Sequence, residues 1–380
     1  MHSFCLYAMK TPKLSDIIGI INKIASPSLA ESWDNSGLQV GDPDSAIECI
    51  MVALDATPAV LEAARNASCQ LLVTHHPLLF KPLKNISTAT PQGRLVHAAI
   101  RANLAVVSMH TSYDVAEGGL NDLLAECLGV SGCRPLQVTT GQELCKLTVY
   151  VPGDHLDQVR GALFPWAEAL GNYRDCSFSA PGEGTFTPLA GARPFIGAVG
   201  SREHVSEQRL ELLMDRRNLP RAVKALLAAH PYEEPAFDIY PLLNEGKPHG
   251  LGRIGSLAEQ TTLSDYTARI KKTLNAPGVR SVGDPAAAVK KVALCSGSGA
   301  SLLREAARCG ADVLVTGDVK YHDAREALDL GITLIDAGHF PSEIIMVDDV
   351  TERLGRMLSE AGYENCRTLP CRVESDPLRV

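Results

Sequence analysis

Two stretches of the sequence decide the fold: CIMVALDATPAVLEAARNASCQLLVTHH at residues 49–76 and KVALCSGSGASLLREAARCGADVLVTGD at residues 291–318. Each contains an apolar V-A-L segment, a helical segment around E-A-A-R and a second apolar segment that ends in L-V-T. In each copy a further helix leads to another apolar segment that ends near a histidine, LAVVSMH at 104–110 and ITLIDAGH at 332–339. This repeated order predicts that a strand–helix–strand half is duplicated in the chain.

The strands of both copies are continuous apolar runs, which are typical of a mainly parallel sheet covered by helices on both faces. Residues 144–245 follow another order: strand, helix, two strands, helix and strand, as in a ferredoxin-like module. We therefore predict an α/β fold, in which a duplicated three-layer unit is interrupted by a ferredoxin-like insertion. The expected domains are a first α/β half at 1–140, the insertion at 141–247 and a second α/β half at 248–380.

The composition is that of a globular protein. The chain has 380 residues, of which 45% are hydrophobic, and this length predicts two or three domains. Such a composition excludes wholesale disorder, and the 31 glycines and 23 prolines show no collagen-like period. With 36 basic and 44 acidic residues the net charge is −8, so the chain lacks the electrostatic signature of a nucleic-acid-binding protein.

The cysteines and the N-terminus bear on the cellular compartment. The 11 cysteines form no C-x-x-C pair, and we expect them to be reduced thiols of a cytoplasmic protein. No apolar run reaches about 18 residues, so we expect no transmembrane helix and no membrane partner. The first eight residues, MHSFCLYA, lack the charged and apolar regions of a secretory signal, and we interpret them as a translation-start extension.

Histidines and carboxylates follow three of the predicted strands. In chain order they are His75, His76, His110, Asp114, His339 and Glu343. Because the carboxyl ends of parallel strands meet at one edge of a sheet, we expect these side chains to converge. Imidazoles and carboxylates without a thiolate motif suit Zn, Fe, Mn or Ni. The sequence therefore predicts a metal site at this edge.

The number of metal ions is suggested by two adjacent histidines. Neighbouring side chains on an extended backbone point in different directions, so His75 and His76 suit two metals better than one. Glu343, four residues after His339, would bridge two ions about 3.5–4 Å apart that share a hydroxide nucleophile. A single-metal site is an alternative. Another is that the histidines are turn residues held by hydrogen bonds, with no metal.

Other polar residues lie after the strands of the second copy. The loop SGSGAS at 296–301 either exposes backbone N–H groups to a phosphate or forms a tight strand–helix turn. Asp318, Lys320 and His322 would transfer protons or orient a substrate, or else Asp318 caps a helix on a solvated face. We expect Trp33, in the loop ESWDNSG, to pack in the core.

Six motifs together resemble the Nif-three-like dinuclear-metal family, whose members are often labelled GTP cyclohydrolase I type 2 homologues. In order they are ESWDNSGLQVGDP, THHPLLF, HTSYD, SGSGAS, TGDVKYHDA and GHFPSE. The resemblance extends from about Met9 to Leu369. HPYEEPAFDIYPL, followed by GLGRIG, resembles the long form of the family, whose inserted domain is similar to PII and CutA-type trimeric modules.

The resemblance implies a ligand set of two divalent ions per chain (Zn, Fe or Mn). The matching residues are His75, His76, Asp114, His339 and Glu343, with Glu343 as the bridging ligand. On the family pattern, His75 and His339 bind one ion. His76 and Asp114 bind the other.

The resemblance also implies a supporting role for His110, which would hold the ligands in place without binding a metal. Ser112 stands where the family usually has Asn, and this leaves the ligand Asp114 in its place. The family tends to form a toroidal homohexamer whose metal sites face an inner cavity, so the resemblance implies copies of this chain as partners.

Such a site predicts a metal-dependent hydrolase or cyclohydrolase. Five protein ligands are too few to saturate two ions, and open positions favour catalysis over a structural role. A metal-activated water would attack a nucleotide or another small substrate, either at a ring carbon of GTP, as the family label suggests, or at a phosphoester. Glu343 is the expected catalytic residue, with Lys320 and His322 as further candidates. The alternative is a non-enzymatic metal-binding protein or regulatory adaptor.

Overall fold

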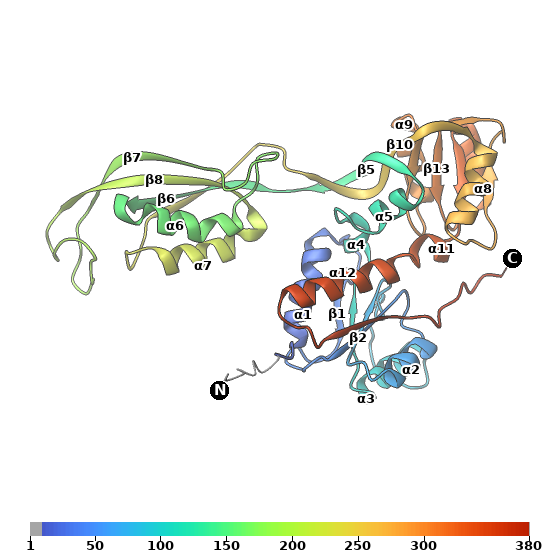
Figure 1. Cartoon of the computed structure of the whole chain (residues 1–380), viewed down its shortest axis with the longest axis horizontal. Helices are drawn as coiled ribbons and strands as arrows, with labels where there is room; N and C mark the ends of the chain where they lie inside the picture. Colours follow the sequence, from blue (N-terminus) through green and yellow to red (C-terminus); the bar gives the residue numbers. More distant parts are fainter. Residues whose placement is uncertain (1–9, 380) are drawn as a thin grey trace, which may run out of the picture. The chain divides into compact units, whose positions relative to one another are not determined.

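The computed structural model describes residues 10–379, so the expected translation-start extension at 1–8 lies outside the described residues. The chain forms two compact units. One joins the residues up to Thr139 to those from His249 onward, and the other comprises Thr140–Pro248. Each unit has its own sheet structure and its own apolar core (Figure 1).

The first half of the larger unit contains a five-stranded sheet in the order β1-β4-β3-β2-β15. Strand β1 pairs antiparallel with β4, and all the other pairs are parallel. The strands are β1 (Gly37–Val40), β2 (Cys49–Ala53), β3 (Leu71–Thr74), β4 (Ala105–Ser108) and β15 (Arg367–Pro370). All residues of β2, β3 and β4 are buried, as their continuous apolar sequences predict.

Helices cover both faces of this sheet. Apolar residues of α2 (Pro58–Asn66) and α3 (Pro91–Arg101) pack on the face that carries Met51 and Ala53. The other face carries Ile50 and Val52, and packs against α1 (Leu14–Ile24) and α12 (Met346–Glu360). Since successive strand residues point to opposite faces, one apolar strand contributes to both cores. The end of the chain, with α12 and β15, therefore completes the first sheet.

The second half contains a six-stranded sheet in the order β11-β14-β13-β12-β10-β5. Strands β12, β13 and β14 are parallel, whereas β11 and β10 pair antiparallel with β14 and β12. The strands are β5 (Val130–Gly141), β10 (Pro248–Thr262), β11 (Arg280–Val282), β12 (Ala288–Leu294), β13 (Val313–Thr316) and β14 (Thr333–Asp336).

Helices also cover both faces of the second sheet. One face packs against α9 (Leu303–Arg308) and α10 (Tyr321–Leu330), and the other against α5 (Leu120–Cys127) and α8 (Leu263–Thr273). The order β12-α9-β13-α10-β14 repeats β2-α2-β3-α3-β4, which confirms the duplication. One short helix follows the third strand of each copy. It is α4 (Thr111–Val115) in the first copy and α11 (His339–Glu343) in the second.

The smaller unit is a four-stranded antiparallel sheet in the order β7-β8-β6-β9. Its two helices share one apolar core with the sheet. The elements are β6 (Leu144–Pro152), α6 (Leu156–Leu163), β7 (Ser177–Phe186), β8 (Glu203–Asp215), α7 (Leu219–Ala229) and β9 (Phe237–Pro241). This order and pairing confirm the predicted ferredoxin-like insertion.

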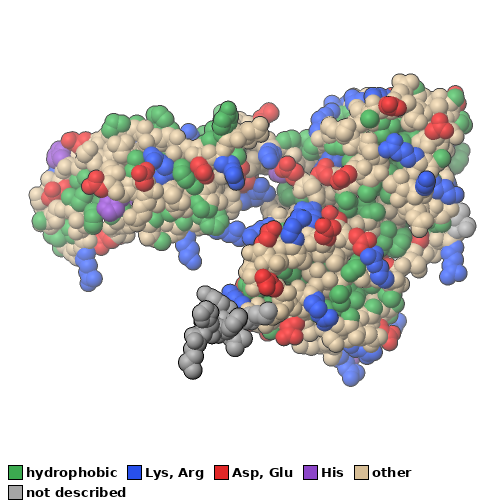
Figure 2. Space-filling model, viewed as in Figure 1, with side chains coloured by type: hydrophobic (Ala, Val, Ile, Leu, Met, Phe, Trp, Pro, Cys, Tyr) green, Lys and Arg blue, Asp and Glu red, His purple; other side chains and the backbone are tan. Residues whose placement is uncertain are grey.

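Single turns of 3-10 helix supplement the longer elements. They lie at Pro27–Leu29, Gly153–His155, Phe164–Trp166, Arg216–Asn218 and Ala300–Leu302. Within residues 10–379, no helix is both long enough and apolar enough to cross a bilayer. Figure 2 shows acidic and basic side chains interspersed over the visible face of each unit.

Candidate metal centre

His75 and His76 follow β3 directly, and each ring is held through its Nδ1 atom. The fully buried His75 ring donates from Nδ1 to the Met109 carbonyl oxygen, 3.0 Å away. The Nδ1 atom of His76 lies 2.9 Å from Oδ1 of Asp55, which follows β2. An imidazole that donates from Nδ1 keeps a lone pair on Nε2, which is the form that binds a metal.

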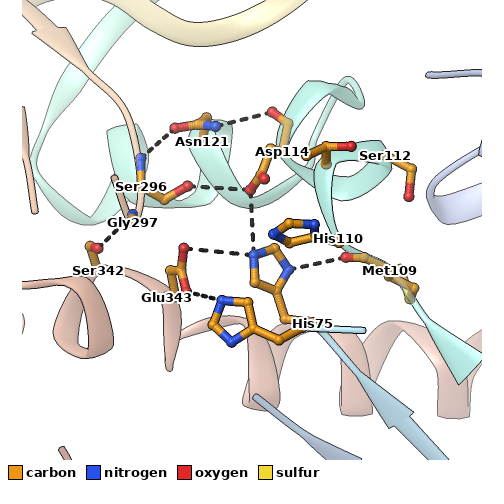
Figure 3. A network of polar contacts seen from close by, with 12 residues as sticks. His75, Met109, His110, Ser112, Asp114, Asn121, Ser296, Gly297, Ser342 and Glu343 are labelled. Atoms are coloured by element: carbon orange, nitrogen blue, oxygen red, sulfur yellow. Dashed lines mark hydrogen bonds and ion pairs between the residues drawn. The ribbon is translucent and has the colours of Figure 1, made fainter. Parts of the chain in front are cut away.

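His110 and Asp114 belong to the turn and short helix after β4. The Nδ1 atom of His110 lies 2.8 Å from Oδ1 of Asp34, whose Oδ2 accepts from the Thr111 hydroxyl at 2.6 Å. Although burial opposes its ionisation, these hydrogen bonds hold the pKa of Asp34 well below its usual range. Asp114 is partly buried, with its side chain 14% exposed, and it accepts a hydrogen bond of 3.3 Å from the Ser296 hydroxyl (Figure 3). Burial raises the pKa of Asp114.

His339 and Glu343 lie one helical turn apart on α11. The Nδ1 atom of His339 is 2.7 Å from Oδ2 of Asp318, and its Nε2 atom is 3.0 Å from Oε2 of Glu343. Glu343 is almost fully buried and packs against Gly297. A Cβ atom at residue 297 would lie only 2.1 Å from Oε1 of Glu343, so a larger residue here would displace the carboxylate. Gly297 is held there by a 3.0 Å hydrogen bond from its N–H to the Ser342 hydroxyl.

The predicted ligands converge around Glu343. The Nε2 atoms of His76 and His339 are 3.3 Å apart, and they lie 3.1 and 3.0 Å from Oε2 of Glu343. On the other side of the carboxylate, Nε2 of His75 lies 3.7 Å from Oε1 and 3.7 Å from Oδ1 of Asp114 (Figure 3). Donors around a four-coordinate ion with bonds of about 2.05 Å lie about 3.3 Å apart, so these spacings suit metal coordination.

The donors fall into two sets that share Glu343. One set pairs His76 with His339, and the other pairs His75 with Asp114. The resemblance implied that His75 and His339 share one ion, whereas in this structure the Nε2 atom of His339 lies 3.3 Å from that of His76. How the ions divide between the ligands stays a prediction. The rings of His75 and His76 are 5.0 Å apart, and both Nε2 atoms approach Glu343 on α11. His75 also approaches Asp114 on α4, and His76 approaches His339 on α11.

His110 stands closer to the donors than a supporting role requires. Ligand atoms of His75, His76 and His110 lie within 4.8 Å of one another. The His110 ring is 5.2 Å from that of His75 and 5.6 Å from that of His76, measured between centroids. With Nδ1 held by Asp34, its Nε2 atom is available as a sixth donor.

The electrostatics of the cluster also suit a cation. Burial opposes the charge on Glu343, yet the facing imidazoles hold its pKa well below the usual range. Contacts with Glu343 likewise raise the pKa of His339 to about 9. Among the described residues, Nε2 of His75 and Oε2 of Glu343 are buried without a hydrogen bond of good geometry. Divalent cations would satisfy both atoms and replace the protons on the rings, so the residues fit a metal centre.

Three carboxylates that hold the histidine rings were missed by the sequence analysis. Neither Asp34 nor Asp55 was among the expected site residues, and Asp318 was expected to transfer protons, to orient a substrate or to cap a helix. In the structure Asp323, not Asp318, accepts from the backbone N–H of Lys320 at the start of α10. Asp55 and Asp318 follow β2 and β13, so their place after neighbouring parallel strands was a usable signal.

The remaining candidates of the second copy do not join the donor sets. His322 is exposed and its ring contacts Tyr321. Lys320 lines a hollow of about 330 Å³ beside Asp318. The loop at 296–301 is a tight turn whose N–H groups at 296, 297 and 299 donate to side chains of the unit. Its other residues, at 298, 300 and 301, line the same hollow as Lys320, and the phosphate-binding interpretation stays a prediction.

Trp33 is not in the core, contrary to expectation. Its side chain is 59% exposed and meets the rings of Phe80 and His110 edge to face. Its neighbour Asp34 is drawn inward by His110 and Thr111, which turns the indole outward at the rim of the cluster.

Comparison with known proteins identifies the family. The profile of Duf34/NIF3 (NGG1p interacting factor 3) matches residues 12–377. The chain belongs to the Duf34/NIF3 family. A Halalkalibacterium halodurans protein named GTP cyclohydrolase 1 type 2 homolog is 40% identical, over 97% of this chain and 99% of its own length. A Bacillus subtilis protein of the same name is 42% identical over 91% and 93%.

Solved structures of Duf34/NIF3 relatives agree with the fold. The structure described as a Bacillus cereus protein related to NIF3 aligns with a TM-score of 0.91 at 37% identity, and covers 98% of this chain and all of its own. A Staphylococcus aureus protein aligns with a TM-score of 0.76 at 30% identity over 98% of this chain. The family resemblance and the α/β fold class predicted from the sequence are both confirmed.

Proposed function

We propose that this Duf34/NIF3 protein is a hydrolase that depends on two divalent cations held at the histidine–carboxylate cluster. One observation carries the proposal: four imidazoles, each fixed through Nδ1, turn their Nε2 atoms to one region that contains the buried Glu343 and the partly buried Asp114. Supporting partners of this kind fix the tautomer and direction of metal-binding histidines. A cluster of structural histidines has no need of such uniform orientation.

Each residue has a definite part in the proposed centre. His76 and His339 would hold one ion, and His75 with Asp114 the other, while the two oxygens of Glu343 face one set each. His110 would serve as a further ligand. Two cations held in this way would supply Lewis-acid activation of water for attack on an electrophilic carbon or phosphorus atom.

The substrate class is supported by the names of the relatives, several of which are GTP cyclohydrolase 1 type 2 homologs. We propose a nucleotide or a phosphoester of similar size. We further propose Zn, Fe or Mn as the metal.

We also propose that the protein works as a homohexamer, which the family resemblance supports. Sedimentation of the full chain measures this oligomeric state directly.

The test compares metal content and turnover in matched variants. We expect the purified protein to bind two divalent ions and to turn over a member of a pool of nucleotides and phosphoesters. Glu343→Gln should lose both ions and all turnover, because this carboxylate faces both donor sets. Glu360→Gln, at the exposed end of α12, is the control and should keep both.

Two other outcomes would separate the alternatives. Full metal loading without turnover of any pool would favour the metal-binding or adaptor protein over the hydrolase. Absence of bound metal at near-stoichiometric level, after loading with each of the three metals, would contradict the metal centre itself.

A further inference from the structure

Two large aromatic side chains stand open to solvent beside the candidate metal centre. Trp33 is 59% exposed and Phe80 is 49% exposed. Their ring centroids are 6.1 Å apart with the ring planes at 63°, and each ring meets His110 edge to face, at 6.0 and 6.2 Å. Large aromatic side chains usually bury most of their surface. Two neighbouring aromatic rings that are exposed beside a candidate metal centre therefore indicate a ligand-binding surface.

The segments that carry these rings are tied together by amide side chains. Asn35 donates from Nδ2 to the Leu79 carbonyl oxygen at 2.6 Å, and the Leu79 N–H donates to Oε1 of Gln39 at 3.2 Å. Gln39 in turn donates from Nε2 to the Asn35 carbonyl oxygen at 2.6 Å. The backbone segments next to the two rings are therefore held against each other before any ligand arrives, which lowers the entropy cost of binding.

The geometry defines how a ligand would lie. A ring inserted between Trp33 and Phe80 would need about 7 Å, that is two contacts of about 3.5 Å. Their 6.1 Å separation excludes this, so a flat ligand lies against the open faces. His110 connects these faces to the donor sets, since its ring centroid is 5.2 Å from that of His75.

We propose that Trp33 and Phe80 form a stacking platform, which selects substrates that contain a planar heteroaromatic ring and positions that ring at the edge of the metal centre. The platform rests on the proposed function and adds a substrate class to it. Stacking of one base on an aromatic side chain changes affinity by about 5- to 150-fold, which is enough to separate ring-containing from ring-free substrates.

The chain allows a direct readout, because it has only two tryptophans, Trp33 and Trp166. In the full-length Trp166→Phe variant, all tryptophan emission comes from Trp33. The probes are GMP and ribose 5-phosphate, which share the sugar and the phosphate and differ in the ring. We expect GMP to quench the emission of the metal-loaded variant to saturation. Ribose 5-phosphate should leave it unchanged and should bind at least about fivefold more weakly by calorimetry.

Substitutions at the second ring supply the controls. Phe80→Ala should weaken GMP binding by about tenfold, whereas Phe80→Tyr keeps an aromatic face and should bind GMP as the parent does. Phe178→Ala removes a comparably exposed phenyl ring from the inserted unit and should have no effect.

Two results would overturn the platform. Equal affinities for GMP and ribose 5-phosphate would show that the ring contributes nothing. An indole that acrylamide cannot reach in the ligand-free protein would show that another copy of the chain covers Trp33. Metal content measured on the same samples separates this inference from the proposed function: ring-dependent quenching without bound metal contradicts only the metal centre, and full loading with equal affinities contradicts only the platform.

Discussion

The contact between Gly297 and Glu343 allows a sharp test of the centre through a single methyl group. A Cβ at residue 297 would lie 2.1 Å from Oε1 of Glu343 and 3.2 Å from Nε2 of His339. Contacts of Cβ atoms below 3.0 Å essentially do not occur, so the carboxylate must retreat by about 1 Å. Metal–ligand distances tolerate only about 0.2 Å. Gly297→Ala should therefore displace the carboxylate that both donor sets share.

We expect Gly297→Ala to lower metal affinity about hundredfold, or by about 2.8 kcal/mol. This is the upper end of the range seen when a residue that positions a metal ligand is changed. Backbone strain must be separated from this effect, because Gly297 has a φ of +58°. Gly331→Ala is the matched control. Its φ is +69° and a Cβ there meets nothing within 4 Å, so it has a similar strain of about 1–2 kcal/mol without the clash.

The assay is competition with a chelator followed by elemental analysis, and urea unfolding of the metal-free forms measures the strain. Both variants should unfold at similarly lowered urea concentrations, and only Gly297→Ala should lose metal. If both variants retain metal equally, Glu343 does not hold the ions through this carboxylate position, and the reasoning is refuted.

Three further predictions concern the groups around the centre. Asp55→Ala should weaken the ion at His76 by about 10- to 100-fold in a metal titration, while Asp42→Ala, in an exposed loop, should not. In the metal-free protein, burial opposes the charged form of His76, but the carboxylates of Asp55 and Glu343 raise its pKa from 6.5 to about 10. The charged His76 ring stabilises the fold fully below about pH 6.5, and this stabilisation is lost as pH rises toward 10. The midpoint of urea unfolding after chelation should therefore fall over this range. A constant midpoint would contradict the prediction. Asp122→Ala leaves the buried Arg253 without its carboxylate partner and should cost about 3 kcal/mol of unfolding free energy, measured by denaturant titration.

The sequence predicted the fold well because the information was local and repeated. Apolar runs such as the one ending at Thr74 identified the parallel strands, and the repeated E-A-A-R helices identified the duplication. The sequence predicted correctly that His75, His76 and His339 follow parallel strands. It placed them at the edge of one sheet, whereas β3 and β14 belong to two different sheets whose carboxyl ends meet at the cluster. That α12 and β15 return to the first sheet did not follow, because no periodicity records which sheet a terminal strand joins.

The details of the site depended on directions that the sequence does not encode. The approach of His76 to His339 depends on how α11 enters the cluster beside the end of β3, which the sequence does not record. Trp33 was expected in the core because of its size, but the inward turn of the adjacent Asp34 places it at the rim. Carboxylates are common after strands, so Asp55 became distinguishable only through its contact with an imidazole.

The central claim is that two cations lie on either side of the Glu343 carboxylate. Anomalous diffraction from crystals of the loaded protein, collected at the absorption edge of the bound metal, tests it most directly. We expect two peaks about 3.5–4 Å apart, one beside His76 and His339, and the other beside His75 and Asp114. One peak alone, or peaks that do not contact Glu343, would contradict it.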